Sequence, residues 1–412
     1  MPWVDGDDLS PANLNAKGAT FVNVRDEDYG AVADGTTDDV TALELAASSA
    51  DTGATLYLSA GTYVIGSPFN INKSISVLCD PNAVLLVSGN GRVDIGSSST
   101  FLSNIIWRGG TIDCAAGNAS AYGISAFISS GCLIEDVTIK DSRSVGISVS
   151  GNTTERTWAT IRRSHISTSW DNGIVTNTGA SDVVVENCVV ENSNVSVAGA
   201  GVYMRGPRST IRECTVDTTG DNALRVQGRD SRIERCYVTN FIGDGIRLMA
   251  SNGVASSCIA DTQTGGGSGH AFRVTDSTGS IVEGCTLSNC IGRNAANGLR
   301  IDSAGSGNSG SHRVLGCLFE YNAADGMNIT AGDWTVLTGN SCYSNTRDGI
   351  RGDDVLYLTA GNNQCRSNGS IGINQITSGA SWTIVGNIAV DNGTSSITWV
   401  DATVASNLTD QP

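Results

Sequence analysis

The segment Gly245-Ile246-Arg247-Leu248 is one copy of the pattern that decides the fold: a small residue, an apolar residue, a variable residue and a second apolar residue. Copies return every 22 to 28 residues, starting at Gly123, Gly146, Gly173, Gly201, Ala223, Gly245, Ala271, Gly298, Gly326, Gly349 and Gly372. A fixed period of this length is typical of solenoids. The repeats are short strand-like segments between Gly and Asn turns, without helical periodicity, and this favours a parallel β-helix over helical repeats.

Composition agrees with one solenoid. The length of 412 residues allows two or three domains, but a solenoid has a single continuous core however long it grows. The 50 glycines and 6 prolines suit many tight turns. A net charge of −16 argues against nucleic acid or an anionic membrane as the main partner. No apolar run reaches 18 residues, so we expect no membrane insertion.

The 12 cysteines are expected to be reduced structural thiols. Eight of them follow the repeat and are predicted to form one buried column, namely Cys188, Cys214, Cys236, Cys258, Cys285, Cys317, Cys342 and Cys365. Four others, Cys79, Cys114, Cys132 and Cys290, are predicted to lie off this column. No cysteine or histidine spacing suits zinc, and Asp353-Asp354 is a weak calcium signal because two carboxylates alone do not make a site. We therefore expect no cofactor.

The N-terminal region differs from the repeats. Residues 1–20 form a polar lead-in, the β-helix domain is expected over 21–405, and 406–412 is a short tail. A helix is predicted over 38–49, with Val40, Leu43, Ala46 and Ala47 on its apolar face. Because a β-helix has an open end, this helix is expected to cap it. The acidic N-terminus is unlike a secretion signal.

Two stretches carry a resemblance to a known family. Tyr29-Gly-Ala-Val-Ala-Asp-Gly-Thr-Thr-Asp-Asp39, followed by Leu56-Tyr-Leu-Ser-Ala-Gly-Thr-Tyr-Val-Ile65, resembles the N-terminal signature of the pectate-lyase-like superfamily of right-handed parallel β-helix proteins. That superfamily includes polygalacturonases, pectate lyases, alginate epimerases and bacteriophage tailspikes. The lead-in Trp3 to Asn15 is similar to the start of many phage tail proteins. The resemblance implies a virion protein, with a cytoplasmic location or release by a non-Sec route as the alternative.

The variable position of the repeat carries arginines on four consecutive coils, Arg225, Arg247, Arg273 and Arg300. If the flanking apolar residues face the core, these side chains share one outer face, about 4.8 Å apart. Two interpretations stay open. The arginines bind the carboxylates of an acidic polysaccharide, or neighbouring acids neutralise them in a surface ion-pair ladder. Trp170 and Tyr203 lie on the coils just before them and are candidates for stacking on sugar rings.

Asp221, Asp244 and His270 lie on three successive coils, just before the repeat unit. Asp before Gly is an ordinary turn residue, so turn chemistry is the alternative for each aspartate. Together the three resemble the polygalacturonase order, which implies Asp244 as general acid, Asp221 in the base pair, His270 in support and Arg300 on the sugar. The family doubles the middle aspartate, whereas here that place is Gly245. A lyase would instead use His270 with Arg247 or Arg273.

The resulting hypothesis is a phage tailspike-like homotrimer that binds and degrades a host surface polysaccharide. Its N-terminus would contact phage tail or baseplate proteins. Two alternatives remain: a free polysaccharide hydrolase or lyase, and a non-catalytic tail or adhesion protein.

Overall fold

The structure is a computed structural model that describes residues 20–119, 121–152, 157–193, 199–262, 269–276, 281–302, 310–376, 381–398, 402–405 and 407–409. The lead-in before residue 20, most of the Gly/Ser-rich stretch 303–311 and most of the C-terminal tail therefore lie outside the described residues. The chain divides into two compact units, Met1–Val190 and Glu191–Pro412, which are taken in turn.

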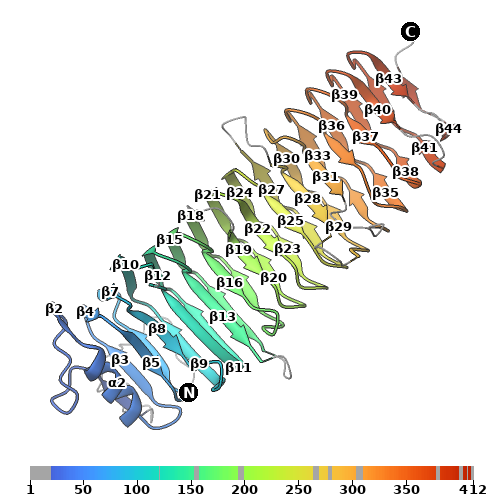
Figure 1. Ribbon diagram of the computed structural model, residues 1–412. Coiled ribbons are helices and arrows are strands. Elements are labelled where there is room, and N and C mark those ends of the chain that lie inside the picture. Colours follow the sequence, from blue (N-terminus) through green and yellow to red (C-terminus); the bar gives the residue numbers. More distant parts are fainter. Residues whose placement is uncertain are drawn as a thin grey trace. The chain divides into compact units, whose positions relative to one another are not determined.

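The first unit is a stack of parallel coils (Figure 1). Each coil crosses three strand positions, and strands at equivalent positions pair in parallel register. One set of paired strands is β1 (Phe21–Asn23), β3 (Thr55–Leu58), β6 (Ser76–Cys79), β9 (Leu102–Arg108), β11 (Ile124–Glu135), β14 (Ala159–Arg162) and β17 (Val184–Glu186). A second joins it through the long β11 and contains β5 (Pro68–Ile71), β8 (Arg92–Ile95), β13 (Ile147–Gly151) and β16 (Ile174–Thr176). The third is β2 (Asp34–Asp38), β4 (Gly61–Ile65), β7 (Ala83–Gly89), β10 (Thr111–Gly117), β12 (Thr138–Ser142) and β15 (His165–Ser169), while β18 (Val189–Ser193) crosses the boundary between the units.

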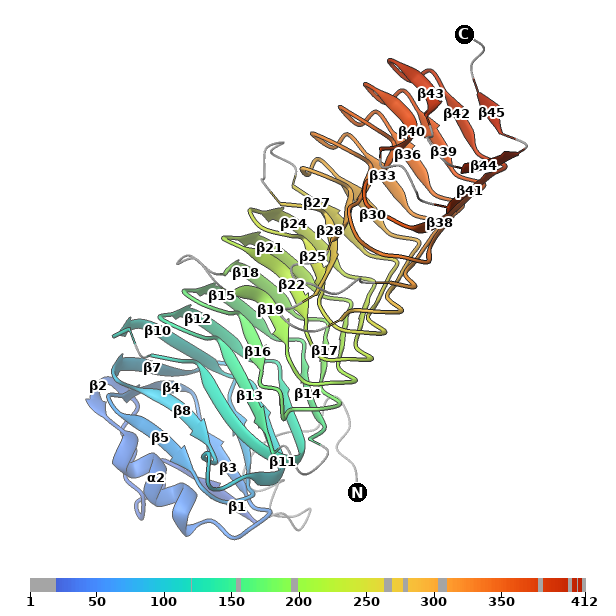
Figure 2. The same ribbon diagram turned by 45° about the vertical axis from the view of Figure 1, so that its right-hand side comes forward.

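The single helix of the described chain, α2 (Val40–Ser49), packs beside β5 (Figure 2). Its buried residues are Val40, Leu43, Ala46 and Ala47, the four on the expected apolar face. Asp38 precedes the helix, and its Oδ1 accepts the Val40 N–H at 3.1 Å. The helix thus presents an apolar side to the first coils.

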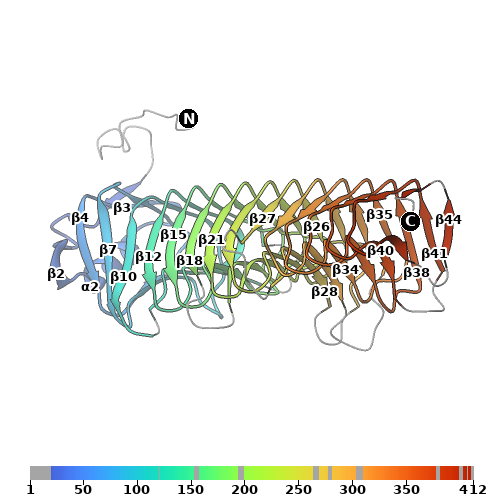
Figure 3. The same cartoon turned by 90° about the horizontal axis from the view of Figure 1, so that it is seen from above.

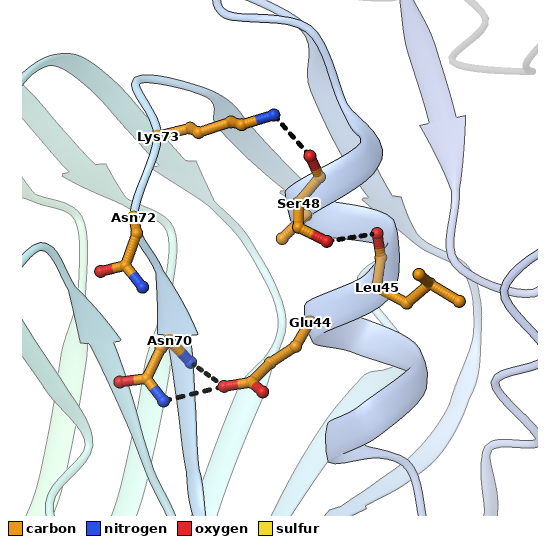
Figure 4. A pocket seen from close by; sticks show the side chains of 7 residues that line it. Glu44, Leu45, Ser48, Asn70, Asn72 and Lys73 are labelled. Atoms are coloured by element: carbon orange, nitrogen blue, oxygen red, sulfur yellow. Dashed lines mark hydrogen bonds between the residues drawn. The ribbon is translucent and has the colours of Figure 1, made fainter.

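A pocket of about 510 Å³ lies between α2 and the β5 coil (Figure 4). Glu44 accepts from both the backbone N–H of Asn70, at 3.0 Å, and its side-chain Nδ2, at 2.8 Å. Lys73 Nζ donates to the carbonyls of Ser48 and Ala50 at the end of the helix. The polar side chains of this pocket therefore fasten the helix to the coil.

Three separate parallel sheets build the second unit (Figure 1). Sheet 1 contains β19 (Ala200–Met204), β22 (Asn222–Val226), β25 (Ile246–Leu248), β28 (Phe272–Thr275), β31 (Leu299–Asp302), β34 (Met327–Ile329), β37 (Ile350–Gly352), β40 (Ile371–Gln375) and β43 (Ser395–Thr398). Sheet 2 contains β20 (Thr210–Arg212), β23 (Arg232–Glu234), β26 (Val254–Ser256), β29 (Thr286–Ser288), β32 (Arg313–Leu315), β35 (Thr335–Thr338), β38 (Tyr357–Gly361), β41 (Ser381–Val385) and β44 (Ala402–Ala405). Sheet 3 contains β21 (Thr215–Thr219), β24 (Tyr237–Phe241), β27 (Ile259–Asp261), β30 (Ile291–Arg293), β33 (Leu318–Glu320), β36 (Ser341–Tyr343), β39 (Gln364–Arg366), β42 (Ile388–Val390) and β45 (Leu408–Thr409).

Side chains along each strand point alternately into the core and away from it. In β25, for example, Ile246 and Leu248 are buried while Arg247 between them is half-buried. Neighbouring coils of the second unit lie side by side (Figure 3), so these apolar residues stack on those of the next coil. The predicted all-β parallel β-helix is confirmed.

All twelve cysteines are buried thiols, but the predicted column is partly wrong. In the second unit, the position just before each sheet 3 strand holds Cys214, Cys236, Cys258, Cys290 and Cys317, and then Asn340, Asn363, Asn387 and Asn407. Cys285 instead precedes β29 in sheet 2, and Cys342 and Cys365 lie inside sheet 3 strands. The connection from β28 to β29 is longer than that from β25 to β26, so counting from the repeat unit puts Cys285 where Cys290 lies.

The asparagines that replace the thiols form a hydrogen-bonded ladder. Asn363 Nδ2 donates to the Leu337 carbonyl and to Asn387 Oδ1, each at 3.0 Å. Its Oδ1 accepts the backbone N–H and the Nδ2 of Asn340, at 3.0 and 2.9 Å. A second ladder at the other end of the sheet 3 strands runs through Asn322, Asn345, Asn368 and Asn392. These amides satisfy buried turn groups that would otherwise lack partners.

Candidate functional site

The arginines share one face of sheet 1 in the second unit. Parallel pairing aligns the variable positions coil by coil, in the order Tyr203, Arg225, Arg247, Arg273, Arg300, Asn328, Arg351 and Asn374. Adjacent members are therefore about one coil spacing, ~4.8 Å, apart. The alignment expected from the repeat holds for every one of these residues.

Two of the four arginines share an ion pair with Asp302, a residue that the sequence reasoning missed. Arg273 donates to it from Nε at 3.0 Å and from Nη2 at 2.7 Å, and Arg300 Nε donates at 2.8 Å. Burial raises the pKa of Asp302, but the hydrogen bonds and charge of Arg273 lower it more, so that pKa lies below its usual range. The signal was strand alternation, because Asp302 follows Arg300 by two residues and so faces the same side.

Arg225 and Arg247 are held differently. Arg247 Nε is buried without a hydrogen-bond partner, and it lies 3.8 Å from Asp244 Oδ2. Burial lowers the pKa of Arg247 against the opposing pull of Asp244. Arg225 Nε contacts the sulfur of Met249 at 3.0 Å, and no described carboxylate forms an ion pair with this guanidinium. The ion-pair interpretation thus describes Arg273 and Arg300 at hydrogen-bonding distance and Arg247 through its longer contact with Asp244, while no described carboxylate pairs with Arg225.

The two predicted sugar-stacking residues have different surroundings. Tyr203 is 5% exposed, with the guanidinium groups of Arg205 and Arg225 4.6 and 4.3 Å from its ring centroid and its hydroxyl on Gln227. Its ring is therefore covered by two guanidinium groups, and the stacking role expected for it stays a prediction. Trp170 belongs to the first unit, is 44% exposed and has the guanidinium of Arg143 5.6 Å from its ring.

A cavity of about 470 Å³ opens at the turns that follow β19, β22 and β25. It is lined by Arg205, Pro207, Gln227, Gly228, Arg229, Met249, Ala250, Ser251 and Ile281. Met249 touches Arg225 and Gln227 binds Tyr203, so the cavity adjoins the Arg225 end of the arginine series. Its two arginines and one amide were not singled out from the sequence, although cations in these turns stand out in a chain of net charge −16.

Asp244 has a structural role that it shares with equivalent residues of other coils. Its Oδ1 accepts the His270 N–H at 3.2 Å, and its own N–H donates to Asn222 Oδ1 at 3.2 Å. Asp325 and Asp348 occupy the same position and repeat the bond, the Asp348 N–H donating to Asp325 Oδ1 at 3.2 Å. The structure thus shows the turn chemistry that was the alternative for Asp244, and its other oxygen lies 3.5 Å from Arg273 Nη1.

Asp221 lies one residue before that position, because the residue in register with Asp244 is Asn222. It is half-buried, and its Oδ2 accepts from Asn222 Nδ2 at 2.7 Å. Burial, with a smaller contribution from the charge of Asp244, raises the pKa of Asp221, and Arg247 opposes this. Only a glycine fits at position 243, because a Cβ there would clash with Asp221 Oδ1.

His270 is 8% exposed, and burial lowers its pKa to about 4. Asn297 Nδ2 lies 3.1 Å from His270 Nδ1, and Asn297 Oδ1 accepts the Asp325 N–H at 3.0 Å. The second bond sets the orientation of the Asn297 amide, so its Nδ2 donates to Nδ1 and the imidazole carries its proton on Nε2. His270 is thus a neutral hydrogen-bond donor at neutral pH.

No group of three or more His, Cys, Asp or Glu side chains among the described residues could hold a metal ion. None of the described helices has the length and apolar character needed to cross a membrane.

The solved structures that resemble this one share its fold at low sequence identity. Bacteriophage phi29 gene product 12, in its pre-mature form, aligns with a TM-score of 0.66 and 15% identity over 93% of this chain and 56% of its own. The A-module of the mannuronan C-5 epimerase AlgE4 from Azotobacter vinelandii aligns with a TM-score of 0.53 and 16% identity, over 93% and 100%. A family 28 exopolygalacturonase from Yersinia enterocolitica aligns with a TM-score of 0.50 and 12% identity, over 78% and 75%.

Sequence families give the closer assignment. A comparison with curated proteins finds no match. The family described as "Right handed beta helix region" matches residues 265–409. The family described as "Rhamnogalacturonase A/epimerase, pectate lyase-like" matches residues 21–292, which is more than half of the chain. Parallel coils, the N-terminal signature and this match agree, and the chain belongs to the pectate lyase-like rhamnogalacturonase A/epimerase family of right-handed parallel β-helix proteins.

Proposed function

We propose that the second unit binds an acidic polysaccharide along sheet 1 and cleaves it. The observation that carries the proposal is the pair Arg225 and Arg247, adjacent in register, with donors that no described carboxylate takes up at hydrogen-bonding distance. Guanidinium groups bind carboxylates with two parallel hydrogen bonds, which suits the uronate units of such a polymer. The cavity beside Arg225 adds Arg205 and Arg229.

Asp221 is the better candidate for the proton donor. Hydrolysis of a glycosidic bond needs a protonated carboxyl group, and burial raises the pKa of Asp221, which favours its protonated form. Asp244 is instead engaged by a backbone N–H and two arginines. We therefore reverse the roles that the family resemblance implies, with Asp221 as the acid and Asp244 as the residue that positions His270 and Arg273.

The comparisons support a polysaccharide as the ligand. The family is pectate lyase-like, and the similar structures include an exopolygalacturonase and a mannuronan C-5 epimerase, both named for polysaccharides.

The test compares Asp221→Asn with Asp244→Asn on a panel of uronate polysaccharides, with Asp348→Asn as the matched control in the same turn position. General acid catalysis contributes roughly 100- to 10,000-fold, so Asp221→Asn should lower turnover by at least about 100-fold while Asp348→Asn leaves it near wild type. Reducing-end release reports hydrolysis, and growth of the unsaturated-uronate absorbance reports elimination. Equal activity of Asp221→Asn and wild type would remove this site.

Binding can be tested apart from cleavage. Arg247→Gln removes the charge of the partly satisfied arginine, whereas Arg300→Gln removes one already paired with Asp302. The first substitution should weaken binding of a polyuronate more than the second, as measured by calorimetry at low salt. Equal effects would contradict the assignment of Arg225 and Arg247 as the anion site.

We further propose that the protein works as a phage tailspike-like homotrimer, with residues 1–20 toward tail or baseplate proteins. The support is the fold shared with phi29 gene product 12, although this chain spans only a little over half of that protein. Mass photometry of the whole chain should give three times the mass of 42.5 kDa. A monomer that releases reducing sugar would instead support a free polysaccharide hydrolase.

One observation favours a non-catalytic binding protein as the second candidate. The carboxylate that the family resemblance makes catalytic, Asp244, performs the same backbone role as Asp325 and Asp348. If the panel shows tight polysaccharide binding without cleavage, this candidate replaces the enzyme.

A further inference from the structure

An exposed aromatic pair lies at the corner of the second unit where the sheet 2 strands begin. Trp334 and Tyr357 occupy equivalent positions on adjacent coils, and their rings stack at 4.1 Å between centroids and 14° between planes. Trp334 is 62% exposed and Tyr357 is 40% exposed. Aromatic side chains of this size normally bury most of their surface, so a stacked pair in solvent needs an explanation.

The backbone at this corner makes tryptophan an unfavourable choice. The corner residue adopts a positive φ on six successive coils, 55° at Arg208, 60° at Asp230 and at Asn252, 69° at Gly284, 59° at Ser311 and 64° at Trp334. This left-handed conformation is tolerated by Gly, Asn and Asp and is costly for bulky side chains. Trp334 is the one aromatic residue of the six, so its presence is explained by what its ring contacts and not by the turn.

Among the described residues, the neighbouring coils place only serines in register with the two outer faces of the pair. Ser311 is in register with Trp334 on one side, and Ser381 is in register with Tyr357 on the other, and both serines are exposed. The next coil along the stack thus offers only a small polar side chain on each side. The open face of Trp334 is therefore available to a flat ligand at about the ~4.8 Å spacing of the coils.

The size of the patch favours a small ring over a protein surface. The two rings expose roughly 200 to 300 Å² together. A stable protein interface buries about 800 Å² on each partner. The surroundings are mostly polar: Ser311, Ser381 and Arg313 are exposed, Arg313 lies on the same strand face as Ser311, and Leu356 beside Tyr357 is the exposed apolar neighbour. An aromatic face bordered by hydrogen-bonding groups matches a pyranose ring, which has an apolar C–H face and hydroxyl groups at its edge.

We infer that Trp334, supported by Tyr357, is a saccharide-binding platform on which one pyranose ring stacks above Ser311. It is separate from the sheet 1 arginines and needs no cleavage chemistry. It rests on the proposed function only in that the ligand is a saccharide.

The test uses Trp334→Ser, which places at this corner the residue found at position 311. Because serine tolerates the left-handed turn better than tryptophan, the melting temperature should be unchanged or higher. Trp158→Ser is the matched control, since Trp158 is 60% exposed but lies in the first unit. Wild type and both variants are applied to an array of neutral and uronate-containing oligosaccharides, followed by calorimetry with one that binds.

We expect Trp334→Ser to weaken saccharide affinity about tenfold, Tyr357→Ser to weaken it less, and Trp158→Ser to leave it unchanged. The saccharide-induced change in tryptophan fluorescence should disappear only in Trp334→Ser. Unchanged affinity in Trp334→Ser, or no oligosaccharide binding by the wild type, would overturn the inference. So would a change of oligomeric mass in Trp334→Ser without a change in affinity, because the pair would then be a contact between copies.

The two proposals fail separately. If Arg247→Gln weakens polyuronate binding and Trp334→Ser does not, the platform alone is wrong. If Trp334→Ser weakens binding while Arg247→Gln and Asp221→Asn behave as wild type, the platform stands and the proposed cleavage site is wrong.

Discussion

At the scale of single residues, Glu135 in the first unit shows how one buried carboxylate can organise several cations. Its side chain is fully buried, yet it accepts at 2.6 Å from Arg108 Nε, from Arg162 Nε and from Arg163 Nη2. Burial raises the pKa of Glu135, but the hydrogen bonds and charges of Arg162 and Arg108 lower it more. The pKa therefore lies below its usual range, and the ionised form is stabilised by folding.

This linkage gives a pH prediction. Because the pKa of Glu135 is lower in the folded chain, its stabilisation is fully present above the unfolded pKa of about 4.3 and is lost as pH falls through the folded value. Glu135→Gln should lower the free energy of unfolding by roughly 2 kcal/mol at pH 7. In denaturant titrations that difference from wild type should shrink below pH 4. A difference that stays constant with pH would contradict the ionised role of Glu135.

His270 gives a second residue-scale prediction. Burial lowers its pKa to about 4, and the same cause lowers that of His312 to about 4. Only three histidines are present, so their NMR signals can be assigned by substitution. We expect the His270 and His312 signals to stay in the neutral form down to about pH 5. A midpoint near 6.5 for His270 would show that its site is open to water.

Some features of single residues could be predicted from the sequence and others could not. The arginine alignment was predictable because the repeat has a fixed strand position, and a period of two then sets which way each side chain points. The burial of Tyr203 was not predictable from the sequence, because it depends on the position of the Arg205 guanidinium over the ring. The offset between Asp221 and Asp244 was missed because the turn before β22 places Asn222, not Asp221, in register.

At the scale of elements, the asparagine ladders account for the regularity of the later coils. Each amide uses both its donor and its acceptor groups, so a coil with an asparagine at this turn is bonded to the coils on both sides. The column of thiols in the earlier coils fills the same place with small apolar groups and weaker hydrogen bonds, as from Cys236 Sγ to the Glu234 carbonyl.

Asn363→Ala tests the ladder. It removes four hydrogen bonds and leaves buried groups of Leu337 and Asn340 unsatisfied, so it should cost about 2 to 4 kcal/mol of unfolding free energy. Gln364→Ala, at an exposed neighbouring position, should change stability by less than about 0.5 kcal/mol. Equal midpoints for the two variants in denaturant unfolding would show that the ladder adds nothing to stability.

Differences in turn length explain why single strands were easier to predict than the alignment of cysteines from coil to coil. Strand-like segments such as Ser76 to Cys79 were recognisable from their own residues. The place of Cys285 and Cys290 within a coil depends on how many residues the preceding turn contains, and sequence spacing does not reveal which turn has grown.

At the scale of the whole molecule, the chain is rich in cysteine, and we expect its stability not to depend on disulfides. All twelve thiols are buried, and burial raises the pKa of Cys132 and of Cys285 to about 12, whereas hydrogen bonds from neighbouring thiols lower the pKa of Cys258 and Cys317. A thiol whose pKa is raised reacts slowly, because the thiolate is the nucleophile.

Thiol labelling checks this across the chain. The native protein should react with a thiol reagent at neutral pH to less than about one equivalent in an hour, and the denatured protein should titrate 12 thiols. A reducing agent should not change the melting temperature. Fewer than 12 thiols after denaturation without reductant would reveal disulfides.

Between Asn322 and Asn392 the asparagine ladders repeat every 23 or 24 residues, which is one coil. Asn322, Asn345 and Asn368 are each 23 residues apart, and so are Asn340 and Asn363. Excising residues 345–367 would therefore join Asn322 to Asn368 and Asn340 to Asn387 with every amide still facing an amide. This part of the chain can therefore gain or lose whole coils, about 4.8 Å of length each, while the contacts between neighbouring coils stay of the same kind.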